Sequence, residues 1–269
     1  MLAGKFFVTD AHCHIYPDRI APLAVAGTDR FYGEKSLYKG TVTDLLEKGE
    51  QAGIDRFVVQ SVATTPHQVK SINEFIAAEV AAHPGKLIGL GTLHPDSADQ
   101  AGDMEHLREL GLHGVKLHPD IQQFKIDDYR CLKIYELCER YGLPILMHTG
   151  DKRFDYSNPN RLLPVLKIYT NLTVIGAHFG GWSVWEQAVE AFGDLQNLYV
   201  DCSSTFPFTD RETFGKLLTY YGAGRVLFGT DYPMWSQKRE LENLLSLGLS
   251  DEDLQQILNT NVSTIFHLE

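Results

Sequence analysis

Short apolar or β-branched runs alternate with longer amphipathic stretches from one end of the chain to the other. The runs have the length and composition of buried strands, and the stretches repeat apolar residues at the spacing of a helix face. Eight runs predict strands, over 5–12, 54–62, 86–94, 113–118, 144–150, 172–179, 198–204 and 226–232. Helices are predicted over 41–53, 67–83, 98–111, 128–142 and 161–170.

The order of these elements predicts one α/β domain over residues 1–269. The strand–helix pair recurs about every 25 to 33 residues after a longer first interval, and eight such units match the TIM (β/α)8 barrel in number and size. The competing architecture is a doubly wound sheet, whose nucleotide-binding form has a glycine-rich first turn. The stretch GLGT at Gly89 lacks the third glycine and the helix start of that turn. We therefore expect the barrel.

Two segments fall outside the regular alternation. Residues 15–39 contain Pro17, Pro22 and two glycines and predict a long first βα loop. A loop of this length in a compact barrel is usually functional, so we expect it to be a lid or a pocket wall. The residues from about Ser250 onward predict one or two extra C-terminal helices on the outside of the barrel and no second domain.

The composition narrows the classes of partner. The chain has a formal net charge of -11, which leaves no basic face for nucleic acid. No apolar stretch approaches the roughly 20 residues that span a bilayer, and residues 1–9 are too short for a signal peptide. We expect a cytoplasmic protein without a membrane partner. The four cysteines show no CxxC spacing and are expected to be reduced.

Candidate metal ligands occur where the predicted strands end. The parallel strands of a barrel open their carboxyl ends at one face, where active sites of this fold gather. Alternate residues of a strand share a side, so His12 and His14 can both face the axis while Cys13 points away. The residues that close the first, fourth, fifth, sixth and eighth strands are His12, His14, Lys116, His118, His148, His178 and Asp231.

A single histidine at a strand end is most often a structural, hydrogen-bonded residue. Several histidines that converge from different strands point instead to a metal. Three imidazoles and a carboxylate match what Zn(II) takes in a catalytic site, with one position left for water. The same donors suit Mn(II), Fe(II) or Co(II). We expect a divalent metal, with zinc as the first choice, and the donors alone leave open whether one or two ions bind.

Four segments carry a family resemblance, namely DAHCH at 10–14, HTG at 148–150, AHFGG at 177–181 and GTDYP at 229–233. With them the chain resembles, over nearly its whole length, the amidohydrolase superfamily, in particular the amidohydrolase-related branch of small lactone hydrolases and nonoxidative decarboxylases. The resemblance implies that His12, His14, His148 and Asp231 bind the metal. It implies that His178 contacts the metal-bound water, and that the substrate is a small molecule. Barrels of this branch are commonly dimers, which makes a homodimer the expected assembly.

Catalytic roles are predicted for Asp231 and His178. A divalent metal lowers the pKa of bound water to roughly 7. Asp231 can accept the proton of that water and pass it to a leaving group, while the metal or His178 stabilises the oxyanion. Asp10 has two interpretations: a contact that fixes the tautomer of a histidine ring, or a buried strand-end carboxylate with backbone partners.

Substrate contacts are predicted for five further residues. Lys116 as an ammonium would hold a substrate carboxylate or carbonyl, although in other branches of the superfamily a lysine on this strand carries CO2 and bridges two metals. Charged loop residues are more often merely solvated, whereas an indole after two glycines is suited to wall a site. The five candidates are Lys116, His118, Arg19, Arg153 and Trp182.

Three functions compete at this level. The first is a metal-dependent hydrolase of a small ester, lactone or amide, and the second is a nonoxidative decarboxylase that uses the same ligands. The resemblance implies that decarboxylases have longer chains and a dedicated arginine clamp, so the near-minimal length of this chain favours hydrolysis. The third is a noncatalytic barrel that binds a metabolite or a metal, and the presence of an acid/base group beside the metal ligands counts against it.

Overall fold

The computed structural model describes residues 5–193 and 195–268, and within them every predicted strand is present. The third predicted strand is divided at Leu90 into two short pieces. The first piece pairs with the preceding strand of the ring, and the second piece pairs with the following one. The strands are β1 (Thr9–His14), β2 (Arg56–Gln60), β3 (Leu87–Gly89), β4 (Gly91–Thr92), β5 (Val115–Leu117), β6 (Ile145–Met147), β7 (Val174–Gly176), β8 (Leu198–Asp201) and β9 (Val226–Leu227).

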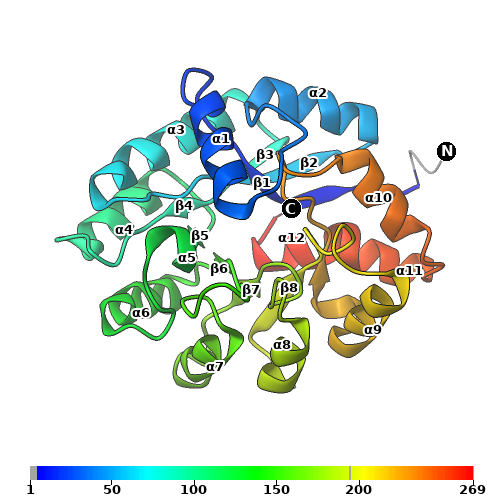
Figure 1. Ribbon diagram of the computed structural model, residues 1–269. Coiled ribbons are helices and arrows are strands. Elements are labelled where there is room, and N and C mark those ends of the chain that lie inside the picture. The colour runs from blue at the N-terminus through cyan, green and yellow to red at the C-terminus, as the bar shows by residue number, and fades with distance from the viewer. Residues whose placement is uncertain (1–4, 194, 269) are drawn as a thin grey trace.

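All strand pairs are parallel and follow the order of the chain. The Leu90 N–H donates to the Val59 carbonyl, and the next residue, Gly91, donates to Gly114, which joins the two sets of strands. The ring closes where the Ala11 N–H donates to the Phe228 carbonyl at 2.8 Å. The predicted barrel is therefore confirmed, and Figure 1 shows its strands inside a ring of helices.

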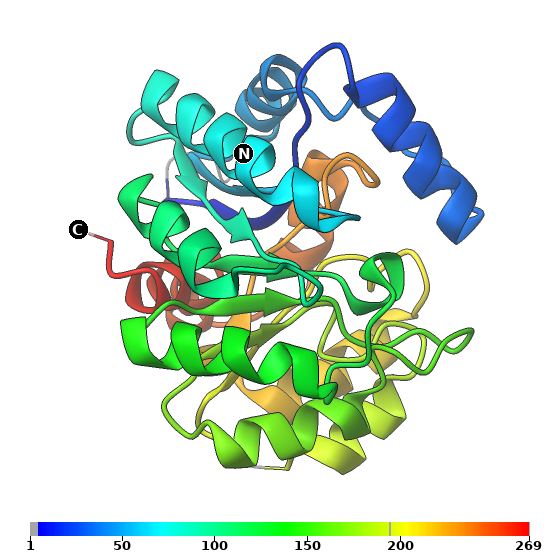
Figure 2. The same cartoon turned by 90° about the vertical axis from the view of Figure 1, so that its left-hand side faces the viewer.

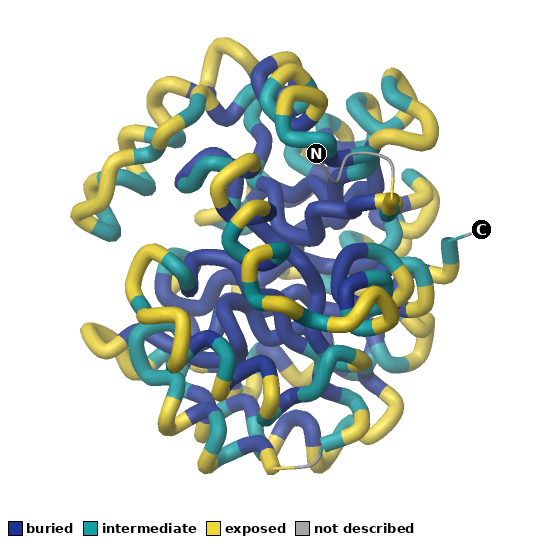
Figure 3. The backbone as a smooth tube through the Cα atoms, turned by 90° about the vertical axis from the view of Figure 1, so that its right-hand side faces the viewer, coloured by how far each residue is buried: buried dark blue, intermediate teal, exposed yellow. Residues whose placement is uncertain are grey.

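Helices cover the outside of the ring, and all five predicted helices are confirmed within a few residues. Their ends follow the usual capping chemistry: the Thr41 hydroxyl accepts the Asp44 N–H, and Gly53 ends the same helix in the left-handed region. Figure 3 shows the buried backbone gathered in the middle and the exposed backbone along the outer helices. They are α2 (Val42–Ala52), α3 (Val69–Ala82), α4 (Gln100–Glu109), α6 (Leu132–Tyr141), α7 (Pro159–Ile168), α8 (Trp185–Phe192), α9 (Arg211–Tyr221) and α10 (Gln237–Leu245).

The segment predicted as a long first loop contains a helix, α1 (Ala21–Tyr32). Pro22 stands in its first turn, where a missing N–H costs nothing, and Gly33 ends it with φ of 73°. Ala21 is its single buried residue, so the helix is held mainly at its ends. In Figure 2 it extends beyond the barrel on the side opposite to the C-terminal helices. It forms one wall of the main cavity, as the sequence predicts.

The C-terminal helices are present, but their predicted position on the outside of the barrel is wrong for the last of them. They are α11 (Asp251–Gln255), a π-helical turn (Gln256–Thr260) and α12 (Asn261–Ile265). Val262, Ile265 and Phe266 pack with interior strand residues such as Val58 and Leu146. They close the amino-terminal end of the barrel, because their apolar side chains extend the interior cluster of strand residues. No helix among the described residues is long and apolar enough to cross a bilayer.

Candidate metal centre and active site

A β-bulge in β1 directs its two histidines toward the centre of the barrel. The register with β2 shifts between Asp10 and Cys13, so that Ala11 packs into the interior apolar cluster while His12 and His14 also meet the site. The Asp10 carboxylate accepts the N–H groups of His12 (3.2 Å) and Thr230 (2.9 Å). Asp10 thus satisfies backbone donors at the bulge. Of its two interpretations, the contact with a histidine ring is wrong and the buried carboxylate with backbone partners is confirmed.

His12, His14 and Asp231 place their ligand atoms close together. The Nε2 atoms of the two histidines lie 3.2 Å apart, and Asp231 Oδ1 lies 3.5 Å from His12 Nε2 and 3.6 Å from His14 Nε2. On the other side of the His12 ring, Nδ1 donates to Asp201 Oδ2 at 2.9 Å. This carboxylate fixes the tautomer of His12 and leaves its Nε2 lone pair for a metal.

His148 and His178 continue the same arrangement. His148 Nε2 donates to the Gly150 carbonyl at 3.1 Å, and its Nδ1 faces His178 Nε2 at 3.2 Å. His178 Nδ1 donates to the Ser203 carbonyl at 3.1 Å, and its ring stacks on that of His12 with centroids 5.2 Å apart. Both rings therefore keep an unprotonated nitrogen on the side of the site.

The donor atoms fit a divalent ion. His12, His14 and Asp231 form one group whose ligand atoms all lie within 4.8 Å of one another. The Lys116 Nζ stands 3.1 Å from His12 Nε2, so the lone pair of this nitrogen is directed toward the site and accepts from a cation in the structure. Imidazole nitrogens and a carboxylate are suitable ligands for zinc, manganese, iron or cobalt. Two further groups of the same kind are His12, His178 and Asp201, and His118, Asp120 and His148.

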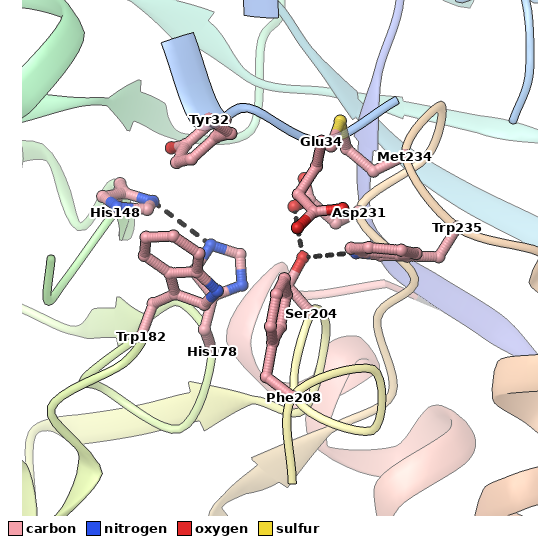
Figure 4. Close-up of a pocket in the computed structure, with 10 residues that line it drawn as sticks. All are labelled: Tyr32, Glu34, His148, His178, Trp182, Ser204, Phe208, Asp231, Met234 and Trp235. Atoms are coloured by element: carbon pink, nitrogen blue, oxygen red, sulfur yellow. Dashed lines mark hydrogen bonds between the residues drawn. The ribbon is translucent and has the colours of Figure 1, made fainter. Parts of the chain in front are cut away.

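A cavity of about 640 Å³ opens above these ligands, and Asp231 and the histidines form its floor. A smaller chamber beside it shares Tyr32, His148, His178 and Asp231 with the larger cavity. Figure 4 shows the chamber, with the His148–His178 contact on one side and a chain from Asp231 through Ser204 to Trp235 on the other. The site thus has room for a small organic molecule over the candidate metal ligands.

The fold and the ligand arrangement agree with a family comparison. The family model described as Amidohydrolase matches residues 9–268. This chain belongs to the amidohydrolase family. It is an enzyme of that family, and metal-dependent catalysis is the general chemistry that the match supports.

Several relatives of this amidohydrolase are decarboxylases. A 2-amino-3-carboxymuconate-6-semialdehyde decarboxylase of Dictyostelium discoideum is 27% identical over 205 residues, which are 60% of this chain and 55% of the relative. The match thus spans about half of the length of that protein. The structure of a 5-carboxyvanillate decarboxylase from Sphingomonas paucimobilis aligns with a TM-score of 0.79 at 16% identity, over 98% of this chain and 100% of the other.

Another solved structure with the same fold contains a metal ion. A dihydroxybenzoic acid decarboxylase from Polaromonas, solved with manganese and 2-nitroresorcinol, aligns with a TM-score of 0.77 at 17% identity over 97% of both chains. The solved decarboxylases are covered almost from end to end. The fold of this chain thus matches the fold of these solved decarboxylases over nearly the full length.

Burial controls the charge of the site. It lowers the pKa of His14 and His148 well below their ordinary value and that of His178 to about 4, so these rings are neutral at neutral pH and keep their lone pairs. Burial raises the pKa of the Asp231 carboxyl, but its electrostatic interactions with His12 and His178, the hydrogen bond from Ser204 and the interaction with Lys116 outweigh burial and hold that pKa below its usual range. The site offers neutral imidazoles and an ionised carboxylate, which are the states that bind metal.

Lys116 and His118 lie close to the metal ligands. Lys116 is fully buried beside His12 and does not line either cavity, and burial lowers its pKa to about 8. The His118 ring stacks on the His148 ring with centroids 4.0 Å apart and lines the larger cavity. Its Nδ1 accepts the Ile121 N–H, so its Nε2 carries the proton and donates to the Tyr32 hydroxyl at 2.7 Å.

The other predicted substrate contacts differ in position. Trp182 lines the smaller chamber, as the sequence predicts. Arg153 is paired with Asp151 at 2.7 Å and donates to the Phe31 carbonyl at 2.6 Å, so it holds the end of α1 and lines neither cavity. Arg19 is exposed and also lies outside both linings, because it precedes α1 on the outer side of the segment. The two arginines are not brought to the site.

Three residues of the site were not predicted from the sequence. Asp201 is the last residue of β8 and holds His12, and it lies within the predicted strand 198–204 as His148 lies within 144–150, so the reasoning applied to His148 would have found it. Tyr32 lies in the segment predicted as a loop, and no local pattern marks it. Ser204 donates to Asp231 Oδ2 at 2.6 Å from a turn after β8, with φ of 48°.

Proposed function

We propose that this amidohydrolase is a metal-dependent nonoxidative decarboxylase of a small carboxylic acid, with residues 1–269 as a single catalytic domain. The observation that carries the proposal is that His12, His14 and Asp231 place their ligand atoms close together, with His148 in the lining of the same organic-sized cavity. The decarboxylases among its relatives support this reaction over the hydrolysis that chain length favours. A homodimer and a cytoplasmic location stay predictions.

The chain would hold one divalent ion through His12 Nε2, His14 Nε2, His148 Nδ1 and an Asp231 oxygen. Zinc fits the donors best, and the manganese in a solved relative supports manganese as the other choice. When bound, the ion acts as a Lewis acid that fixes and polarises the substrate oxygens. Asp201, Gly150 and Ser203 hold the outer nitrogens of His12, His148 and His178, so these rings do not reorient when substrate enters.

The reaction requires one proton in the right place. The bond from carbon to the carboxylate breaks, its electron pair stays on the carbon, CO2 leaves, and a proton takes its position. Asp231 and His178 line both cavities and are the groups suited to hold this proton at Oδ2 and Nε2. Because the Tyr32 oxygen accepts the proton of His118, its own O–H is free to donate to a substrate oxygen.

Hydrolysis is the second candidate, and one observation favours it. Among the described residues, neither cavity is lined by an arginine or a lysine that could clamp a carboxylate away from the metal. A neutral ester or lactone would suit such a lining. Asp231 or His178 would then take the proton of the attacking water and return it to the leaving oxygen.

A paired assay separates these functions. The zinc- or manganese-loaded protein is incubated with a panel of hydroxybenzoates and a panel of lactones, with CO2 and released acid measured in both. The proposal predicts CO2 from a hydroxybenzoate without acid release from a lactone. Acid release from lactones alone would contradict it and establish hydrolysis. A metal-loaded protein that binds compounds from both panels and converts none would support the noncatalytic alternative.

A further inference from the structure

The larger cavity continues from the metal ligands into a channel between α1 and α3. Along this channel α1 contributes small side chains at Ala24, Gly27 and Thr28, while α3 contributes Ile72 and Phe75. The α1 side chain Leu23 also lines the channel and is 78% exposed. The channel is therefore continuous with the site and largely apolar.

The charge of the lining restricts what can occupy the channel. Asp231 is the one residue with a carboxylate, ammonium or guanidinium group in the lining of the larger cavity, as far as the described residues show. An anionic group placed between α1 and α3 would lose water without gaining a charged partner. A second carboxylate of a dicarboxylic acid is therefore disfavoured there, whereas an uncharged apolar group gains from burial.

Gly27 lines the channel, and the packing of neighbouring residues does not require a glycine at this position. It lies inside α1, where glycine is destabilising by roughly 0.5–1 kcal/mol relative to alanine. A Cβ atom built on Gly27 would meet nothing within 4 Å. No neighbouring side chain therefore excludes a larger residue at position 27. Because Gly27 has no side chain, the channel stays open there.

We propose that the channel between α1 and α3 binds an uncharged apolar substituent of the substrate, whose single carboxylate lies at the metal. The proposal rests on the proposed function for the carboxylate, while the apolar part follows from the channel alone. It defines the substrate class as a monocarboxylic acid with an alkyl or aryl extension.

A series of hydroxamates tests the channel without turnover. Hydroxamates chelate divalent metals and carry no carboxylate to lose, so their binding does not depend on decarboxylation. Calorimetry with the metal-loaded protein is expected to show affinity rising about two- to fourfold per methylene from acetohydroxamate to octanohydroxamate. Equal affinities across the series would overturn the proposal. A rising series in a protein that releases no CO2 would retain the channel and reject only the proposed reaction.

A matched pair of probes tests the charge. Succinic acid monohydroxamate and butanohydroxamate have the same chain length, but the former places a carboxylate in the channel. We expect the charged probe to bind at least about tenfold more weakly, because its carboxylate is desolvated without a charged partner. Equal binding of the two probes would overturn the restriction to monocarboxylic acids.

Gly27→Leu tests the location. Leucine there fills the channel from α1 without displacing a neighbour, and it favours the helix. The variant is expected to bind acetohydroxamate like the unmodified protein and to lose the gain with chain length. Gly215→Leu is the control, since Gly215 also lies in a helix, α9, with nothing within 4 Å of its Cβ position. A full chain-length gain in Gly27→Leu would overturn the proposal.

A second copy of the chain is the other candidate to cover the channel. In that case the hydroxamate series would be flat, and Leu23→Glu would convert a dimer into a monomer in sedimentation. These two results together would overturn the proposal and assign the channel to a subunit interface.

Discussion

At the amino-terminal end of the barrel, Val58, Leu146 and Leu227 point into an apolar cluster that α12 completes. At the carboxyl-terminal end, the same ring of strands carries His148 and Asp231 to the floor of the large cavity. His148 follows Leu146 by two positions, with only Met147 between them, so both side chains face inward by ordinary strand alternation. The barrel therefore changes from a packed core to a binding site within a few ångströms along each strand.

The two ends also differ in backbone regularity. The apolar end uses plain strands, whereas the site end has the bulge of β1 and left-handed φ values of 60° at His178 and 57° at Asp231. Such non-glycine conformations cost on the order of 1–3 kcal/mol each and persist only when surrounding structure enforces them. The apolar end therefore contributes favourable free energy of folding, which offsets the unfavourable backbone conformations at the site end.

The largest expected effect is at the site end. Asp231→Asn removes the ionised carboxylate from the metal ligands and from proton transfer, so kcat should fall by about 10²- to 10⁴-fold. Turnover is measured together with metal content by elemental analysis. A variant that retains both metal and full turnover would show that Asp231 takes no part in the chemistry.

The apolar end should show a large effect on stability alone. Phe266 is 3% exposed in the interior cluster, and Phe266→Ala should lower the free energy of unfolding by about 3–5 kcal/mol. Denaturant unfolding measures the change. Phe208→Ala, at the rim of the site, is the control and should cost no more than about 1 kcal/mol, because Phe208 is 39% exposed. Equal losses in the two variants would remove the contrast between the ends.

A buried acid behind the bulge should make stability depend on pH. Burial raises the pKa of Glu240 from 4.5 to about 8, so the unfolded chain releases this proton before the folded chain does. The protonated Glu240 side chain therefore makes its full contribution to the free energy of unfolding below pH 4.5. This contribution is lost as the pH rises to 8, at up to about 1.4 kcal/mol per pH unit. Glu240→Gln should abolish this loss in unfolding titrations between pH 5 and 8. An unchanged pH slope would contradict the assignment.

A smaller effect, on metal affinity, is expected from the carboxylate of Asp201, which binds the outer nitrogen of His12. Asp201→Asn withdraws the carboxylate that fixes His12, and metal affinity should fall about 10- to 100-fold. Competition with a chelator measures the affinity, and thermal unfolding checks that the variant is folded. Asp210→Asn, which alters a helix cap on the surface, should leave the affinity unchanged. The assignment fails if the two variants bind metal equally well.

The regular end of the molecule was predictable from the sequence, and the irregular end only in part. Strand alternation predicts the barrel and places His148 at a strand end, because each strand buries its own apolar residues. The bulge of β1 leaves no trace in the hydrophobic pattern, so the sequence alone did not decide between the two interpretations of Asp10. The inward packing of α12 was missed because an amphipathic helix has the same sequence pattern whether it packs on the outside of the barrel or closes its amino-terminal end. The contact of Arg153 with the end of α1 joins residues far apart in the sequence, so the spacing of residues along the chain does not predict it.

The central claim is that one ion joins side chains from β1 and from the turns after β6 and β9. A crystal structure of the protein loaded with manganese or zinc tests it most directly, with the ion located by its anomalous signal. The account predicts one ion bound by His12 Nε2, His14 Nε2, His148 Nδ1 and an Asp231 oxygen, at about 2.0–2.3 Å. An ion held instead by His118, Asp120 and His148, or no ion after loading, would contradict it.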